Sequence, residues 1–202
     1  AIAFSAKRGT SDDAQAQMHV LPMGGPGEAV AITELSTGAS NPRWSPDGSL
    51  IAFESSVWPD AEDDEANAER AKAEEDDGIN VSRYEIFPIR SWNRWRDQKQ
   101  TRLFVQAAEA GAEVSDLLFG TELVQGRGYE GGLEAAWTPD GKALIVTATE
   151  NLDEAAHAVV REHLYRVSLE GGEPQPITDS EDFSCGNAVF SSDGKHLYCS
   201  YR

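Results

Sequence analysis

The chain has 202 residues, 40% of them hydrophobic, and a formal net charge of −18 at pH 7. Such an acidic balance argues against a nucleic-acid partner, because the protein would repel phosphates rather than release counterions from them. No apolar stretch approaches the roughly 18 residues of a membrane-spanning helix, so we expect a folded protein without a membrane span.

The first predicted elements are strands. Residues 1–6 read AIAFSA, and residues 18–33 read MHVLPMGGPGEAVAIT, which is a strand, a Gly-Gly turn, a short run and a terminal Ile-Thr. The second pattern recurs as LYRVSLEGGEPQPIT at 164–178 and, less clearly, as RLFVQAAEAGAEVSDLL at 102–118. A pattern that recurs along a chain indicates a structural repeat.

Residues 41–55, NPRWSPDGSLIAFES, begin the second repeated element. Its copies are EAAWTPDGKALIVTA at 134–148 and NAVFSSDGKHLYCSY at 187–201. Each has an aromatic residue, a polar pair, Asp-Gly and then alternating apolar residues. Because Asp-Gly supplies the positive φ of a tight turn, each copy predicts a β-hairpin. We interpret the aspartates as turn residues; they are Asp47, Asp140 and Asp193.

Alignment on the turn glycines puts equivalent residues on the same strand face. Phe53, Val146 and Cys199 then share one position, and Phe4 of the opening strand fits the same register. This predicts that Cys199 is a buried thiol. A disulfide between Cys199 and Cys185 stays open but is not favoured, because cross-strand pairing would put Cys199 nearer to Asn187.

The repeat period predicts the fold class. Ile2 to Ile51 spans 49 residues and Leu144 to Leu197 spans 53, the size of a four-stranded propeller blade. We therefore expect an all-β domain over residues 1–202, a partial β-propeller of about three four-stranded blades. Since a closed ring has typically about four to eight blades, we expect a piece of a larger protein.

The longer interval between two hairpins predicts an insertion at residues 57–100. It contains PDAEDDEANAERAKAEEDDG, which predicts a helix with Asp60 as its N-cap and Gly78 as its stop. Only alanines could be buried by this helix, so we expect it to lie in solvent or against a partner domain. The alternative, two blades in this interval, lacks a second hairpin motif.

A cationic and aromatic cluster follows in IRSWNRWRD, residues 89–97. Arg90, Trp92 and Trp95 are our candidate substrate-binding residues, because Arg can bind a carboxylate through two hydrogen bonds and Trp can anchor a ligand. In the purely structural alternative, the tryptophans fix the insertion to its sheet and the arginines pair with the acidic helix. Both interpretations stay open.

Other candidate sites are weaker. An acidic run in the insertion could bind a peptide amino group or a cation, although a solvated charged face is the simpler interpretation; its residues are Glu62, Asp63, Asp64 and Glu65. No calcium-loop spacing occurs. The four histidines show no ligand spacing, so we predict no metal site and no cofactor.

The motif Trp-Ser-Pro-Asp-Gly with Ile-Ala-Phe, together with Gly-Gly-Glu-Pro before Ile-Thr, resembles the propeller repeat of the prolyl oligopeptidase family of serine peptidases and of TolB-like periplasmic propellers. Residues 57–105 resemble an insertion in the dipeptidyl-peptidase and acylaminoacyl-peptidase branch, with Trp-Pro-Asp, Asp-Asp-Glu-Ala-Asn-Ala, and Arg-x-Trp-x-x-Trp before Leu-Phe-Val. Two positions depart from that branch: Ser91 stands in place of His and Asn93 in place of Asp.

This resemblance implies a serine exopeptidase whose propeller gates and helps to bind peptide substrates. Its Ser-His-Asp residues would lie in a C-terminal α/β-hydrolase domain outside this chain, because no Gly-x-Ser-x-Gly occurs in these residues. It further implies a periplasmic or secreted protein, otherwise a cytoplasmic one, and leaves a homodimer open. The alternative is a TolB-like, non-catalytic propeller that binds other proteins.

Overall fold

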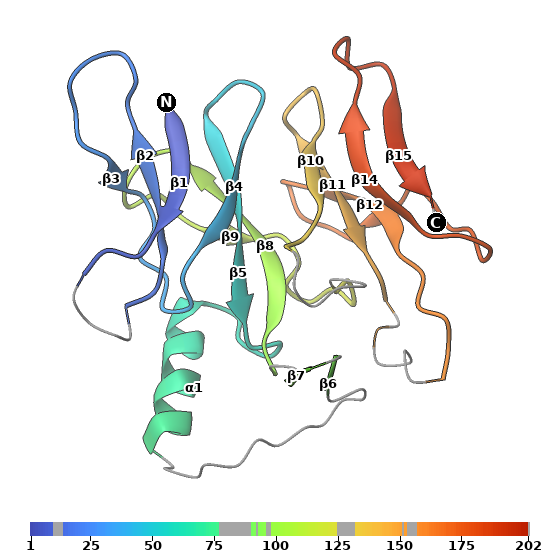
Figure 1. The fold of residues 1–202 in the computed structure, drawn as a ribbon, viewed down its shortest axis with the longest axis horizontal. Helices are drawn as coiled ribbons and strands as arrows, with labels where there is room; N and C mark the ends of the chain where they lie inside the picture. The colour runs from blue at the N-terminus through green and yellow to red at the C-terminus, as the bar shows by residue number, and fades with distance from the viewer. Residues whose placement is uncertain are drawn as a thin grey trace. The chain divides into compact units, whose positions relative to one another are not determined.

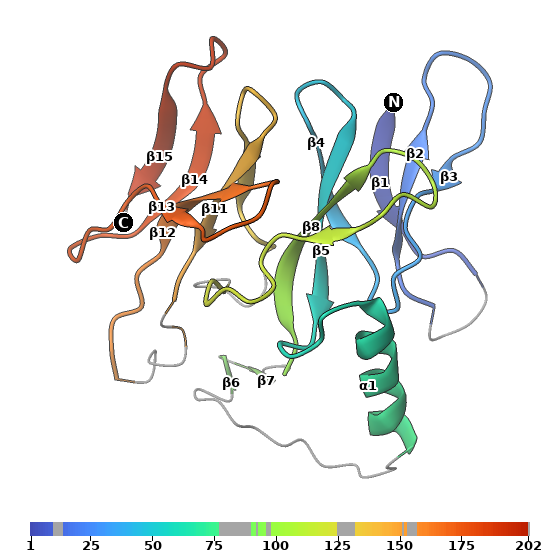
Figure 2. The same cartoon turned by 180° about the vertical axis from the view of Figure 1, so that it is seen from behind.

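The computed structural model describes residues 1–9, 14–76, 90–91, 93–95, 98–124, 132–150, 152 and 157–201. Antiparallel sheets make up most of the structure, with one helix among the described residues. The chain divides into two compact units, residues 1–82 with 99–119, and residues 83–98 with 120–202. Figures 1 and 2 show the strands and the helix from opposite sides.

The first unit contains two sheets. One has the order β1-β2-β3, and its strands are β1 (Ile2–Ala6), β2 (Gln17–Leu21) and β3 (Val30–Ala31). The other has the order β4-β5-β8-β9, and its strands are β4 (Ser40–Trp44), β5 (Leu50–Val57), β8 (Gln100–Ala107) and β9 (Ser115–Asp116). Both are meanders, in which each strand pairs with the next strand of its sheet along the chain.

The core of the first unit lies between these two sheets. Its buried residues come from both of them, and they are Met18, Ile32, Ala39, Ile51, Phe53, Val57 and Phe104. Phe53 and Phe104 face each other across β5 and β8, with ring centroids 5.8 Å apart. Burial of these apolar side chains, rather than the polar strand edges, holds the two sheets face to face.

An insertion interrupts the second sheet without breaking its register. Val57 at the end of β5 pairs directly with Gln100 at the start of β8, so residues 58–99 leave and re-enter the sheet at one point. They contain the helix α1 (Asp64–Asp76) and a short hairpin of β6 (Arg90–Ser91) and β7 (Arg94–Trp95). Figure 1 shows α1 after the end of β5.

The helix begins later than its sequence predicts. The Ala66 amide donates a 2.8 Å hydrogen bond to the Asp63 carboxylate, which makes Asp63 the N-cap. The expectation of Asp60 in that role is wrong, because Asp60 lies in the turn that precedes the helix. The predicted stop, Gly78, lies outside the described residues. Apart from Asn67 the helix buries none of its side chains.

The second unit contains a four-stranded meander and a two-stranded hairpin. The meander has the order β10-β11-β12-β13, and its strands are β10 (Ala135–Trp137), β11 (Ala143–Ala148), β12 (His163–Ser168) and β13 (Gln175–Pro176). A hairpin of β14 (Cys185–Phe190) and β15 (Leu197–Tyr201) follows. Ile145, Leu164 and Cys185 are buried where the hairpin packs on the meander.

The three Asp-Gly turns have the same local structure. Their glycines have φ of 73° at Gly48, 68° at Gly141 and 70° at Gly194, the left-handed region that glycine adopts at little cost. In each turn the aspartate accepts a hydrogen bond from the hydroxyl two residues before it, at 2.7 Å from Ser45 and 2.6 Å from Thr138 and from Ser191. The interpretation of these aspartates as turn residues is confirmed.

In each of the three larger sheets, the strand that carries the equivalent apolar position pairs with the next strand of that sheet along the chain. Phe4 pairs with His19, Phe53 with Phe104, and Val146 with Tyr165. The Ile-Thr ends repeat too, because Thr33 accepts from the Met18 amide and Thr178 from the Leu164 amide, each at 2.9 Å. The all-β class is thus supported, while the described residues show no closed ring of sheets and the propeller stays a prediction.

Cys199 is exposed, so the prediction of a buried thiol is wrong. Phe53 and Val146 lie in central strands that have a neighbour on both sides. β15, by contrast, pairs only with β14 among the described residues. The register position of a residue predicts on which face of its strand the side chain lies. Whether that side chain is buried depends on whether other strands cover the face.

Candidate functional site

Two of the three candidate binding residues form one pair. Arg90 and Trp95 lie directly opposite each other in the β6–β7 hairpin, and the Arg90 guanidinium lies 5.6 Å from the centroid of the Trp95 ring. This distance is within the range of a cation–π contact. Trp92, the third candidate, lies outside the described residues.

The Arg90–Trp95 pair is at the surface. Trp95 is 63% exposed. Arg90 is exposed as well. A guanidinium stacked on an exposed indole still presents its N–H groups to solvent, and such a group can bind a carboxylate through two parallel hydrogen bonds.

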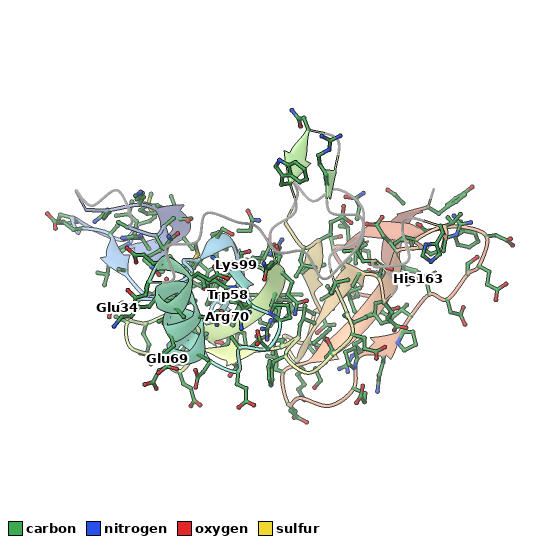
Figure 3. All side chains as sticks on the ribbon, turned by 90° about the horizontal axis from the view of Figure 1, so that it is seen from below. Glu34, Trp58, Glu69, Arg70, Lys99 and His163 are labelled. Atoms are coloured by element: carbon green, nitrogen blue, oxygen red, sulfur yellow. The ribbon has the colours of Figure 1, made fainter. Side chains whose placement is uncertain are left out.

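A different tryptophan anchors the insertion. Trp58, the first residue after β5, is 2% exposed, and the Lys99 ammonium lies 4.1 Å from the centroid of its ring (Figure 3). Because Lys99 is the last residue before β8, this contact joins the two ends of the insertion. Trp58 therefore has a structural role at the base of the insertion.

Arg102 in β8 completes the base of the insertion, a role that was not apparent from its sequence position. It is 1% exposed and forms a 2.8 Å ion pair with Asp116 of β9. The same guanidinium donates to the carbonyls of Trp58 and Ala61. One buried cation therefore binds the third strand, the fourth strand and the first residues of the insertion together.

Asp116, which pairs with Arg102, experiences opposing effects on its pKa. Burial raises the pKa of Asp116 above its usual range, and this outweighs the opposing effect of the Leu118 amide, the Arg102 charge and the Phe119 amide. The Arg102 side chain also lies 5.2 Å from the Phe119 ring centroid. These contacts are structural, since a guanidinium surrounded in this way has no access to a ligand.

A second buried carboxylate stabilises the first hairpin. The Glu54 side chain is 2% exposed, and it accepts hydrogen bonds from Arg43 at 2.7 Å and from Asn41 at 2.9 Å. Asn41 has φ of 51° and lies where the register between β4 and β5 shifts. The carboxylate therefore fixes a β-bulge, which makes a structural role the simplest account of this cluster.

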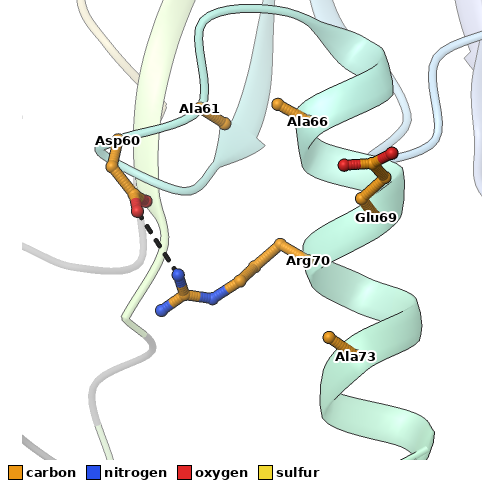
Figure 4. A pocket seen from close by; sticks show the side chains of 6 residues that line it. All are labelled: Asp60, Ala61, Ala66, Glu69, Arg70 and Ala73. Carbon is orange, nitrogen blue, oxygen red and sulfur yellow. Dashed lines mark hydrogen bonds and ion pairs between the residues drawn. The ribbon is translucent and has the colours of Figure 1, made fainter.

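An open hollow of about 290 Å³ lies between α1 and the turn before it, and Figure 4 shows the side chains that line it. Its walls are Asp60, Ala61, Ala66, Glu69, Arg70 and Ala73. Arg70 and Asp60 form a 3.3 Å ion pair across it, and both are exposed. With alanine walls and one exposed ion pair, the hollow offers little apolar burial to a ligand.

The acidic run before α1 has local structural partners. Asp63 caps the helix, and Asp64 accepts hydrogen bonds from the amide and the hydroxyl of Ser36, at 2.8 Å and 2.7 Å. Within the described ranges, no group of three His, Cys, Asp or Glu side chains is placed to hold a metal ion. In the same part of the chain, no helix is long and apolar enough to cross a membrane.

Comparison with known proteins identifies no relative of this chain. No protein-family model matches the chain, and no curated protein shows significant similarity to it. The Arg90–Trp95 pair therefore stays a candidate site, which the sequence predicts and for which the structure gives the pairing and the exposure.

Proposed function

We propose that these residues are part of the propeller of a serine peptidase of the prolyl oligopeptidase family, in which they gate and help to bind peptide substrates. The Ser-His-Asp residues would belong to an α/β-hydrolase domain outside the 202 residues. There the serine, activated by the histidine, attacks the peptide carbonyl, and the acyl-enzyme is then hydrolysed. The propeller supplies no reacting group.

The repeated meander supports the part of this proposal that makes these residues a segment of a propeller. Hairpins with the same turn chemistry begin sheets with the same strand order in both units. Stacked sheets of this kind surround an axis in propellers, and a ring placed over an active site admits peptides while excluding folded proteins. A TolB-like binding propeller would share the repeat, but the resemblance of residues 57–105 favours the peptidase.

The proposal that these residues help to bind peptides rests on the exposed Arg90–Trp95 pair. A chain with net charge −18 repels the carboxylates of peptides, so an exposed guanidinium beside an indole offers a local site of opposite charge. Its hydrogen bonds would orient the carboxylate, and the Trp95 ring would contact an apolar side chain of the peptide. The pair would act as a positioning site, and its loss should weaken binding more than chemistry.

The test is steady-state hydrolysis of short peptides by the product of the whole reading frame that contains these residues. Arg90→Ala should raise KM by about tenfold or more, because a hydrogen bond to a charged group contributes about 1.5–3 kcal/mol, with kcat within about twofold of the parent value. Arg70→Ala is the matched control, since it removes another exposed arginine of the insertion. Unchanged KM in Arg90→Ala, or an equal rise in Arg70→Ala, would contradict the role of the pair.

A further inference from the structure

Cys185 and Cys199 lie on one face of the β14–β15 hairpin. Cys185 pairs with Tyr201 and Gly186 with Ser200. Cys199 precedes Tyr201 by two residues, and side chains two apart on a strand point to the same face. The two cysteines are therefore diagonal neighbours across the ladder, and both are free thiols.

A β-bulge lies beside this pair. The register shifts between Gly186 and Val189, and Asn187 within the shift has φ of 53°. A bulge increases the local twist of a hairpin and so changes the separation of diagonal neighbours. Partial burial, and after it the neighbouring Cys185 thiol, raises the pKa of Cys199.

The two thiols differ in their access to solvent. Cys185 is 4% exposed and packs with Ile145 and Leu164. Cys199 is exposed. An accessible thiol next to a shielded one is the arrangement in which an external oxidant reacts first with one sulfur and the second sulfur then resolves the adduct.

We propose that Cys185 and Cys199 are a dithiol that closes to an intramolecular disulfide by exchange with a small disulfide such as glutathione disulfide. The deprotonated Cys199 sulfur attacks one sulfur of glutathione disulfide, whose S–S bond breaks and releases one glutathione. The Cys185 sulfur, once deprotonated, attacks Cys199 in this mixed disulfide and releases the second glutathione. Two protein thiols are oxidised, and one disulfide is reduced to two thiols.

The closed bond has a defined structural consequence. β15 pairs only with β14 in the described part of the chain, and the disulfide would tie the two strands together at their bulged end. It would stabilise the hairpin by restricting the unfolded chain. Because the pKa of Cys199 is raised, its thiolate is scarce near neutral pH, and closure should accelerate as pH rises.

The test is peptide mapping of the folded chain after incubation with glutathione disulfide and blocking of remaining thiols. Lys195 lies between the two cysteines, so trypsin separates residues 167–195 from residues 196–202 unless a disulfide joins them. We expect one linked peptide that separates on reduction, and the loss of both free thiols in a monomeric protein. The same incubation in strong denaturant should give less of this linkage per unit time.

Three results would overturn the proposal: both thiols still titratable, glutathione retained on Cys199 without the linked peptide, or a disulfide between two chains. Cys185→Ser is the control, and it should accumulate the glutathione adduct on Cys199. Should that buried substitution disturb folding, Cys199→Ser provides a second control at an exposed position, where Cys185 should resist the reagent. Rapid modification of Cys185 in folded Cys199→Ser would also count against the proposed order of steps.

Discussion

Arg102 shows how a single residue can define the base of the insertion. Its guanidinium is 1% exposed, it is paired with Asp116, and it donates to the carbonyls of Trp58 and Ala61. A buried charge of this kind adds little net stability when it is complete, but its removal leaves the partner groups buried and unpaired. The insertion therefore depends on a residue that belongs to the sheet.

Arg102→Ala should lower the free energy of unfolding by about 3–5 kcal/mol, the usual cost of breaking a buried ion pair. Urea unfolding followed by circular dichroism measures the change. Arg70→Ala is the control, because the exposed pair of Arg70 with Asp60 contributes at most about 1 kcal/mol. Similar losses of unfolding free energy in the two variants would show that the buried ion pair of Arg102 contributes no more than an exposed one.

The turn aspartates predict how the hairpins respond to acid. The Ser45 hydroxyl, then the Ser49 amide and hydroxyl, lower the pKa of Asp47 to about 2. A carboxyl whose pKa is lower in the folded than in the unfolded chain stabilises the fold above the unfolded value, and this contribution is lost as pH falls through the folded value. Asp140 and Asp193 have pKa values lowered in the same way, first by the hydroxyls of Thr138 and Ser191.

We therefore expect Asp47 to titrate with a midpoint near 2 in the folded chain, followed by NMR of its carboxyl group. In Ser45→Ala, which keeps the turn sequence but removes the first hydrogen bond, the midpoint should move up toward about 3.9. A midpoint in the parent chain that already lies at the unperturbed value would mean that the hydroxyl does not bind the carboxylate in solution.

For the helix α1, the sequence pattern predicts that a helix forms but not which residue is its N-cap. The alanine- and glutamate-rich segment indicates a helix because its residues have high helix propensity. The cap was misplaced because several acidic residues precede the helix, and any of them could cap it. Only the hydrogen bonds distinguish them: Asp63 binds the Ala66 amide, whereas Asp64 binds Ser36.

Asp63→Ala should destabilise the helix by about 1 kcal/mol, the typical contribution of an N-cap. Since α1 buries only Asn67, the loss should be local, and amide hydrogen exchange of the helix should become about five- to tenfold faster while global unfolding changes little. Asp60→Ala is the control and should leave exchange in the first turn nearly unchanged. Equal acceleration in both variants would contradict the assignment of the cap.

For the whole molecule, the sequence was most informative where residues recur at a fixed spacing. The Asp-Gly motifs predicted turns that have the same local geometry at Gly48, Gly141 and Gly194. Each of these predictions needs only local chemistry and the two-residue period of a strand. Repetition thus made the hairpins predictable from the sequence alone.

The same reasoning failed where a property depends on distant parts of the chain. Cys199 occupies the position of Phe53 but is exposed, because burial requires a covering strand. Likewise, Arg102 lies in a strand, and its neighbours along the chain do not indicate the carbonyls to which it donates hydrogen bonds. For the candidate site, the sequence predicted the residue types, and the structure added the stacking of Arg90 on Trp95.

Hydrolysis of aminoacyl and dipeptidyl chromogenic substrates tests the central claim most directly, with two proteins compared under the same conditions. One is the 202-residue chain, and the other is the product of the whole reading frame that contains it. We predict no hydrolysis by the first, and hydrolysis by the second that a serine-directed inhibitor abolishes. Inhibitor-sensitive hydrolysis by the 202 residues alone, or none by the whole product, would contradict the assignment to a peptidase propeller.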